Sequence, residues 1–230
     1  MYSSLQNLLY EKKISLIASL PENNPILARA AIQAGADAIK MHVNVQHQAS
    51  GNSFDATEVY QDQFREIRGG FSGPIGIVPG GACEAITASE MEQLTELGFN
   101  YFSIYAHHMP TWMLNLNNFE KTFAISCDYS PDGIGEVTHL GVTALEASII
   151  PGSEYGSPLT FRDILAYNSL VQHTDIPVLV PSQRKLAPSD ILSLYKAGVK
   201  AVMLGAIVVG KTEESIKSAV SSFRDAIDSL

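Results

Sequence analysis

Short apolar runs alternate with amphipathic segments along the whole chain, and the two kinds differ in period. The apolar runs are typical of buried strands, whereas the segments between them repeat their apolar residues about every 3.6 positions, as helices do. We therefore expect strands and helices to alternate. The pattern predicts eight strands, over residues 14–20, 37–45, 74–79, 99–107, 122–128, 142–149, 177–182 and 200–206.

A repeated glycine indicates how these elements are joined. A helix-like run, a glycine and a strand-like run follow one another at Ala34–Ile39, Leu97–Phe102, Leu140–Leu145 and Ala197–Val202. Glycine suits the position after a helix, where a positive φ turns the chain into the next strand. Because the repeats fall on every second predicted strand, they favour a closed ring over an open doubly wound sheet. The sequence predicts an α/β fold, a single (β/α)8 TIM barrel formed by residues 1–230.

The helical segments carry start signals of different strength. Asn24, Thr160 and Thr212 are each followed by an amphipathic pattern, and these residue types cap the first turn of a helix. The segment Pro110–Lys121 has the weakest helical pattern of the chain.

The glycine repeat also sets the register of the even-numbered strands, because side chains alternate between the two faces of a strand. Counted from each glycine, the third, fifth and seventh residues share one face. This face becomes more polar toward the carboxyl ends, while the opposite face is apolar, as a surface under helices should be. We expect the first face to line the interior in layers of four: Ala38, Tyr101, Ala144 and Ala201, then Lys40, Ser103, Glu146 and Met203, then His42, Tyr105, Ser148 and Gly205.

One interior layer contains two opposite charges, Lys40 and Glu146. A buried ion pair seldom stabilises a protein more than an apolar pair would, because desolvation offsets the attraction. Below the carboxyl ends of barrel strands, where barrel enzymes bind substrates, chemistry explains such a pair better than stability. We predict that Lys40 transfers a proton or forms a Schiff base, with Glu146 as its acid–base partner.

Further polar residues follow at the ends of the predicted strands. His42 and Asn44 end the second strand and Asp128 ends the fifth, so we expect His42 and Asp128 to take part in catalysis and Asn44 to bind substrate. The spacing of His42 and Asn44 would suit a metal ion, but strand 74–79 carries no further histidine or carboxylate. We therefore expect neither a metal nor another cofactor.

The last two predicted strands end where TIM barrels often bind phosphate, through backbone amides and a helix N-terminus. Gly205 and Ala206 follow the eighth strand, and Gly allows a ligand to approach the backbone closely. The seventh strand ends in Ser182, Gln183 and Arg184. We predict that these five residues, together with Ser148, bind the substrate and its phosphate.

Composition removes several other classes of protein. The chain has 230 residues, 46% of them hydrophobic, and a net charge of −9 from 15 Lys+Arg and 24 Asp+Glu. This much apolar surface argues against disorder, and the acidic balance argues against a nucleic-acid partner. No apolar run approaches the roughly 18 residues of a membrane span. We expect a cytoplasmic protein with no membrane partner, and a homodimer stays open.

The last quarter of the chain resembles a known group of barrels. Pro177-Val178-Leu179-Val180, Pro188-Ser189-Asp190, Ala197-Gly198 and Leu204-Gly205-Ala206 are similar to the closing segments of phosphate-binding TIM barrels of the ribulose-phosphate-binding type. That group includes N-acetylmannosamine-6-phosphate epimerases and thiamine-phosphate synthases. Leu145-Glu146-Ala147-Ser148 and Ala34–Ile39 resemble the geranylgeranylglyceryl-phosphate synthase-like branch. The resemblance implies a phosphorylated substrate, although Ser182-Gln183-Arg184 replaces the glycine-rich run of those families.

Three functions follow from these observations. The first is an enzyme that acts on a small phosphorylated carbonyl compound such as a sugar phosphate, either an epimerase or isomerase through an enediolate, or an aldolase through a Schiff base on Lys40. The second is a prenyl transferase-like enzyme that transfers a group to a phosphorylated acceptor, with Mg²⁺ held by a carboxylate such as Asp128. The third is a barrel that binds a ligand without catalysis.

Overall fold

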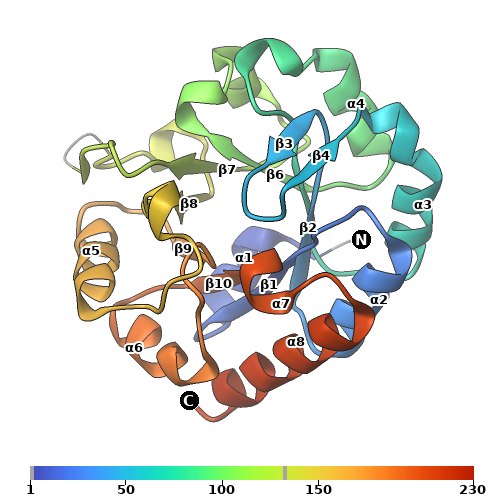
Figure 1. Cartoon of the computed structure of the whole chain (residues 1–230). Coiled ribbons are helices and arrows are strands. Elements are labelled where there is room, and N and C mark those ends of the chain that lie inside the picture. Colours follow the sequence, from blue (N-terminus) through green and yellow to red (C-terminus); the bar gives the residue numbers. More distant parts are fainter. Residues whose placement is uncertain (1–2, 132–133) are drawn as a thin grey trace.

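Eight parallel strands close into a barrel in the computed structural model, which describes residues 3–131 and 134–230 (Figure 1). Strand β1 pairs with both β2 and β10, so the ring has no free edge. The predicted TIM barrel is confirmed, and seven predicted ranges contain one barrel strand each, while β7 begins two residues before its range. The barrel strands are β1 (Ser15–Ser19), β2 (Ala38–His42), β5 (Ile75–Val78), β6 (Tyr101–Tyr105), β7 (Glu120–Ile125), β8 (Ala144–Ala147), β9 (Val178–Pro181) and β10 (Ala201–Leu204).

Helices surround this barrel (Figure 1). The predicted caps are confirmed, because the side chains of Asn24, Thr160 and Thr212 each accept a hydrogen bond from an amide of the first turn. The helices are α1 (Leu5–Glu11), α2 (Pro25–Gln33), α3 (Gln61–Gly69), α4 (Ala88–Glu96), α5 (Phe161–Gln172), α6 (Ile191–Lys196), α7 (Ala206–Val209) and α8 (Glu213–Asp228). None of them crosses a membrane, since no helix in the described ranges is both long and apolar enough.

The weak helical pattern of Pro110–Lys121 does not become an α-helix. The chain between β6 and β7 forms two short 3-10 turns, at Ala106–His108 and Thr111–Asn115, and β7 then begins at Glu120. A further 3-10 turn, Thr138–Leu140, precedes β8. These connections are short and leave room at the carboxyl ends of the strands.

Helix α1 packs against the barrel interior and was not predicted. Its Leu5 and Leu9 are fully buried and join the interior cluster that includes Ile17 and Tyr101. The Glu120 carboxylate at the start of β7 accepts hydrogen bonds from the amides of Leu5, at 2.7 Å, and Gln6, at 2.9 Å. Helix α1 therefore covers the amino-terminal end of the barrel, opposite the cavity described below.

The predicted register of the interior is confirmed in its first layer. Ala38, Tyr101, Ala144 and Ala201 are all fully buried in one cluster inside the barrel. The Tyr101 ring lies across this layer, and a Cβ at Gly76 would overlap with it. Glycine is required on β5 because the aromatic ring occupies the space of a side chain.

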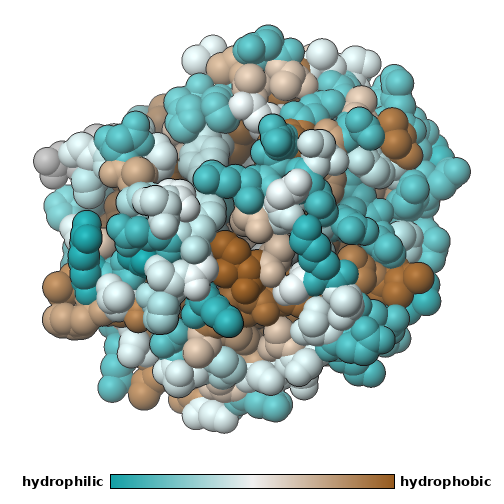
Figure 2. All heavy atoms as spheres, in the orientation of Figure 1, coloured by the Kyte–Doolittle hydropathy of each residue, from teal (hydrophilic) through white to brown (hydrophobic). Residues whose placement is uncertain are grey.

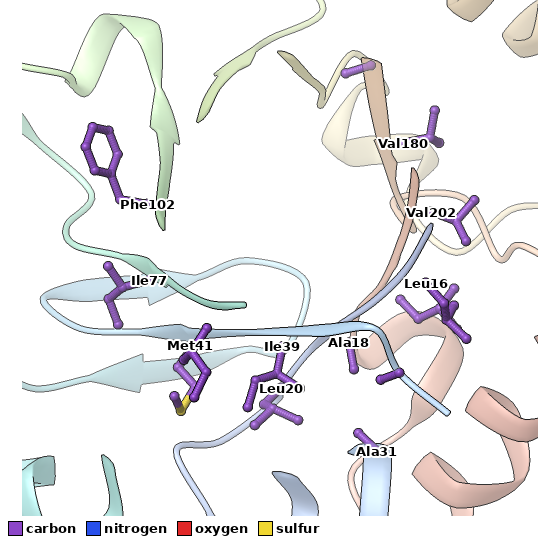
Figure 3. Close-up of a cluster of buried hydrophobic side chains, with 14 of the residues drawn as sticks. Leu16, Ala18, Leu20, Ala31, Ile39, Met41, Ile77, Phe102, Val180 and Val202 are labelled. Carbon is purple, nitrogen blue, oxygen red and sulfur yellow. The ribbon is translucent and has the colours of Figure 1, made fainter. Parts of the chain in front are cut away.

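The opposite faces of the strands carry the larger hydrophobic core. Figure 3 shows Leu16, Ile39, Ile77 and Val202 in this core between the strands and the helices, with Ala31 of α2 packed nearby. Since Ile39 and its neighbour Met41 belong to this core, Lys40 between them must point into the barrel.

A small hairpin lies over the carboxyl ends of the strands and was also not predicted. It consists of β3 (Val45–His47) and β4 (Asn52–Phe54), which pair antiparallel directly after β2 (Figure 1). Asn44 begins it with a left-handed backbone, φ 53°, a conformation that asparagine tolerates better than most residues. The second predicted strand therefore ends at His42, and the hairpin covers one side of the barrel opening.

Candidate active site

A cavity of about 300 Å³ opens at the carboxyl ends of the barrel strands. This volume is at the lower end of the range of small-molecule sites. Barrel strands, the hairpin and the loops after β5, β6, β8 and β9 all contribute to it. Its polar lining side chains are Ser19, Lys40, Gln46, His47, Gln48, Ser103, Tyr105, His108, Glu146, Ser148, Tyr155, Ser182 and Gln183.

Lys40 and Glu146 meet at the inner end of the cavity, as their register predicts. Lys40 Nζ donates a hydrogen bond to Glu146 Oε2 at 3.0 Å, and the two residues are only 4% and 7% exposed. Ser103 Oγ donates to the same oxygen at 2.5 Å, and Ser148 Oγ donates to Oε1 at 3.3 Å. The pair therefore forms a buried, hydrogen-bonded polar group below the open part of the cavity.

These contacts decide the charge of Glu146. Burial alone raises the pKa of a carboxyl group, but the Lys40 ammonium and the hydrogen bonds from Ser103, Lys40 and Ser148 outweigh it and hold the pKa of Glu146 below its ordinary value. Glu146 is consequently a carboxylate at neutral pH. A carboxylate beside an ammonium gives the site both a proton acceptor and a hydrogen-bond donor.

His47 of the hairpin reaches the cavity from the side and was missed by the sequence analysis. Its Nδ1 lies 3.0 Å from Ser50 Oγ. Burial, and then the positive charge of Lys40, lower the pKa of His47 to about 4, although Glu146 acts in the other direction. His47 is therefore an uncharged imidazole at neutral pH.

Two tyrosines form the opposite side of the cavity. Tyr105 bonds to Ser148 and Tyr155, and Gln183 Nε2 donates to the Tyr155 hydroxyl at 2.6 Å. Gln183 Oε1 in turn accepts the Ile150 amide at 3.0 Å. Burial raises the pKa of both tyrosines, so each keeps its proton and can only donate or accept a hydrogen bond.

The predicted phosphate end is partly in the cavity. Ser182 and Gly205 both line it, and Ser182 Oγ accepts the Gly205 amide at 2.7 Å. The next two amides, of Ala206 and Ile207 at the start of α7, have no acceptor among the described residues. Figure 2 shows hydrophobic side chains gathered over α7, beside this edge of the opening.

Arg184 lies outside the cavity lining and is paired within the protein. Its Nη2 donates to Asp163 Oδ1 at 2.9 Å and also to Glu154, and its Nη1 donates to Ser157. Arg184 and Asp163 are 5% and 4% exposed. Two carboxylates thus hold the guanidinium that was expected to bind phosphate, so it tethers α5 and the loop after β8 to the end of β9.

Three other predicted site residues also lie outside the cavity lining. The His42 ring is fully buried between the rings of His47 and Phe54, at 4.3 and 4.8 Å, because the hairpin folds over it. Asn44 donates to the Glu90 carboxylate at 2.8 Å and anchors the hairpin. Asp128 is exposed and bonds to Ser126. The described residues contain no group of three or more histidines, cysteines or carboxylates that could hold a metal ion.

Comparison with known proteins places the fold. No family model and no curated protein matches the chain. Solved structures do match it: thiamine phosphate pyrophosphorylase from Pyrococcus furiosus (13% identity, TM-score 0.64, 98% of each chain covered), tryptophan synthase from Mycobacterium tuberculosis (11%, 0.74, 99% of each), and KGPDC from Streptococcus mutans in complex with a phosphorylated ligand (14%, 0.67, 95% of this chain and 99% of that one). The chain is a (β/α)8 barrel of the fold that these proteins share.

Proposed function

We propose that this barrel is an enzyme that removes a proton next to the carbonyl group of a small phosphorylated compound. The observation that carries the proposal is the buried Lys40–Glu146 pair, 3.0 Å apart at the inner end of a cavity of about 300 Å³. Such a pair presents a donor for a carbonyl oxygen and an acceptor for the adjacent carbon-bound proton. Isomerisation or epimerisation through an enediolate follows from that chemistry.

Each residue has a distinct role in this step. Lys40 donates a hydrogen bond to the substrate carbonyl oxygen and stabilises the negative charge that develops there. Glu146 takes the proton from the neighbouring carbon, and the electrons of that C–H bond form the C=C bond of the enediolate. When the carbonyl oxygen replaces Glu146 as the acceptor for Lys40, the carboxylate loses a hydrogen bond that lowers its pKa and becomes a stronger base.

Acid–base chemistry fits the site better than a Schiff base. A Schiff base needs an uncharged amine as the nucleophile. Glu146 stabilises the ammonium form of Lys40 through a direct hydrogen bond, and His47 is uncharged and so does not oppose it. The aldolase alternative therefore requires a proton shift that the ion pair disfavours.

The phosphate would lie near the ends of β9 and β10. The Ser182 hydroxyl and the amides of Ala206 and Ile207 are the donors on that side. Lys40 is the only lysine or arginine among the described lining residues, so neutral donors would hold the phosphate. KGPDC from Streptococcus mutans, which has the same fold, was solved in complex with a phosphorylated ligand, and this supports a phosphorylated ligand here.

Hydrogen–deuterium exchange tests the proposal without knowledge of the product. Ketose and aldose phosphates of three to six carbons are incubated with the protein in D₂O, and loss of the proton next to the carbonyl is followed by NMR. We expect exchange with at least one compound, and its abolition in Lys40→Met and Glu146→Gln. Lys121→Met is the matched control, because Lys121 is also buried in a barrel strand but lies outside the cavity lining.

Borohydride separates the two chemistries in the same samples. Covalent labelling of Lys40 in the presence of a ketose phosphate would assign the aldolase mechanism instead. Exchange that persists in both Lys40→Met and Glu146→Gln would refute the proposed function.

A further inference from the structure

The hydrogen bonds around Ser50 determine which nitrogen of His47 carries the proton. Ser50 Oγ accepts the Asn52 amide at 3.3 Å and donates its own hydrogen to the His47 carbonyl at 3.5 Å. Its contact with His47 Nδ1, at 3.0 Å, must then be one in which Nδ1 donates. His47 therefore carries its proton on Nδ1, and Nε2 has a free lone pair.

The ring of His47 is held so that Nε2 faces the cavity. One face of the ring packs on His42 at 4.3 Å, and Phe54 meets it edge-on at 6.4 Å. Both nitrogens of His42 are enclosed by protein without a partner, whereas Nε2 of His47 is not enclosed and the residue lines the cavity. Since Nδ1 is turned to Ser50, the free lone pair is the part of the ring open to a ligand.

Charge keeps this nitrogen an acceptor. The charged groups that act on His47 are Lys40 on β2 and Glu146 on β8, and His42 stacked on it is itself uncharged because burial lowers its pKa well below 6.5. Burial and Lys40 together outweigh Glu146, so protonation of His47 is disfavoured at neutral pH. A neutral Nδ1–H imidazole can accept a hydrogen bond at Nε2 but cannot donate one there.

We propose that His47 Nε2 accepts a hydrogen bond from a hydroxyl group of the substrate, and that the substrate is therefore a hydroxy ketone or hydroxy aldehyde. The carbonyl lies at Lys40 and the hydroxyl points to the hairpin. This inference rests on the proposed function for the carbonyl site, and adds to it the class of compound and a residue that determines specificity. A carbonyl compound without the hydroxyl leaves Nε2 without its partner.

The tautomer is tested on the free protein. Nitrogen-15 NMR of histidine-labelled protein distinguishes a protonated from an unprotonated ring nitrogen. We expect Nδ1 of His47 to be protonated and Nε2 bare between pH 6 and 8, with Ser50→Ala releasing this preference. A proton on Nε2, or on both nitrogens, in the wild type would overturn the inference whatever the enzyme does.

Affinity for a matched pair of ligands tests the hydroxyl contact. Dihydroxyacetone phosphate and hydroxyacetone phosphate differ by one hydroxyl group, and calorimetry gives their dissociation constants. We expect the first to bind about tenfold more tightly, the effect of one net hydrogen bond, and this preference to disappear in His47→Phe. His107→Phe is the control, because His107 stacks on Tyr105 at the cavity but lies outside its described lining, and it should keep the preference.

The outcomes separate this inference from the proposed function. A wild-type preference that depends on His47, without any exchange in D₂O, would support the hydroxyl contact and refute the enzyme mechanism. Exchange with an undiminished preference in His47→Phe would support the mechanism and overturn the hydroxyl contact. Equal wild-type affinity for both ketones, or no binding of either, would overturn it as well.

Discussion

The two halves of the Lys40–Glu146 pair should differ in what their removal costs. Glu146 keeps two further donors, Ser103 at 2.5 Å and Ser148 at 3.3 Å, when Lys40 is replaced. Lys40, in contrast, has Glu146 as its only acceptor among the described residues. Replacement of Glu146 therefore leaves the more poorly compensated charge.

The magnitudes follow from the charges that remain. Breaking a buried pair by removing one partner costs about 3–5 kcal/mol, and loss of the proton limits the cost of a lone lysine to roughly 4–5 kcal/mol at pH 7, the free energy of deprotonating an ordinary lysine. We expect Glu146→Gln to cost about 3–4 kcal/mol of unfolding free energy. Lys40→Met should cost about 1–3 kcal/mol, because the serines still satisfy the carboxylate. The double variant should cost less than the sum, since no charge is left unpaired.

Urea unfolding at pH 7 and pH 9 measures these values. In Glu146→Gln the unfolded chain binds more protons than the folded chain below the ordinary lysine pKa, so stability should rise with pH. Wild type should lack this rise between pH 7 and 9. Additive costs in the double variant, or Lys40→Met more damaging than Glu146→Gln, would refute this account of the pair.

Three further predictions concern the interior, the hairpin and the loop after β9. Gly76→Ala should lower the unfolding free energy by about 1–3 kcal/mol or more, measured by urea denaturation, because its Cβ would overlap with the Tyr101 ring. The pKa of His47 is lowered from 6.5 to about 4, so the unfolded state binds more protons below pH 6.5 and up to about 3 kcal/mol of stability should be lost between pH 6.5 and 4; His47→Phe should show a shallower loss over this range in the same titration. Arg184→Ala should cost about 3–5 kcal/mol by leaving Asp163 buried without its partner, and thermal denaturation with and without phosphorylated ligands will show whether affinity changes as well.

The barrel and its interior register could be predicted because they depend on local pattern. The glycine repeat aligns four strands with one another, and alternation then places Lys40 and Glu146 on the same face at the same height. Their 3.0 Å contact follows from the closed ring without any knowledge of the loops. The same alternation places Tyr101 inside, although the matching glycine on β5 becomes understandable only when the ring is seen across it.

The rest of the site depends on contacts between segments far apart in the chain. His47 belongs to a hairpin whose strands have three residues each, too short for a period to be recognised. A positive φ at Gly51 in its turn was the one local signal available. Arg184 looked like a free cation because its partner Asp163 lies on a different helix, and Asp163 looked like a capping residue, which it also is.

The bond between Glu120 and helix α1 constrains the order in which the protein can fold. Helix α1 leaves the ribosome long before β7, yet its amides wait for a carboxylate more than a hundred residues later. Strand β1 likewise pairs with β10, near the other end of the barrel sequence. Such distant contacts slow folding, because a long loop must close before they form. The first helix to be synthesised is thus among the last to find its place, and until then Leu5 and Leu9 stay exposed to water and to other chains.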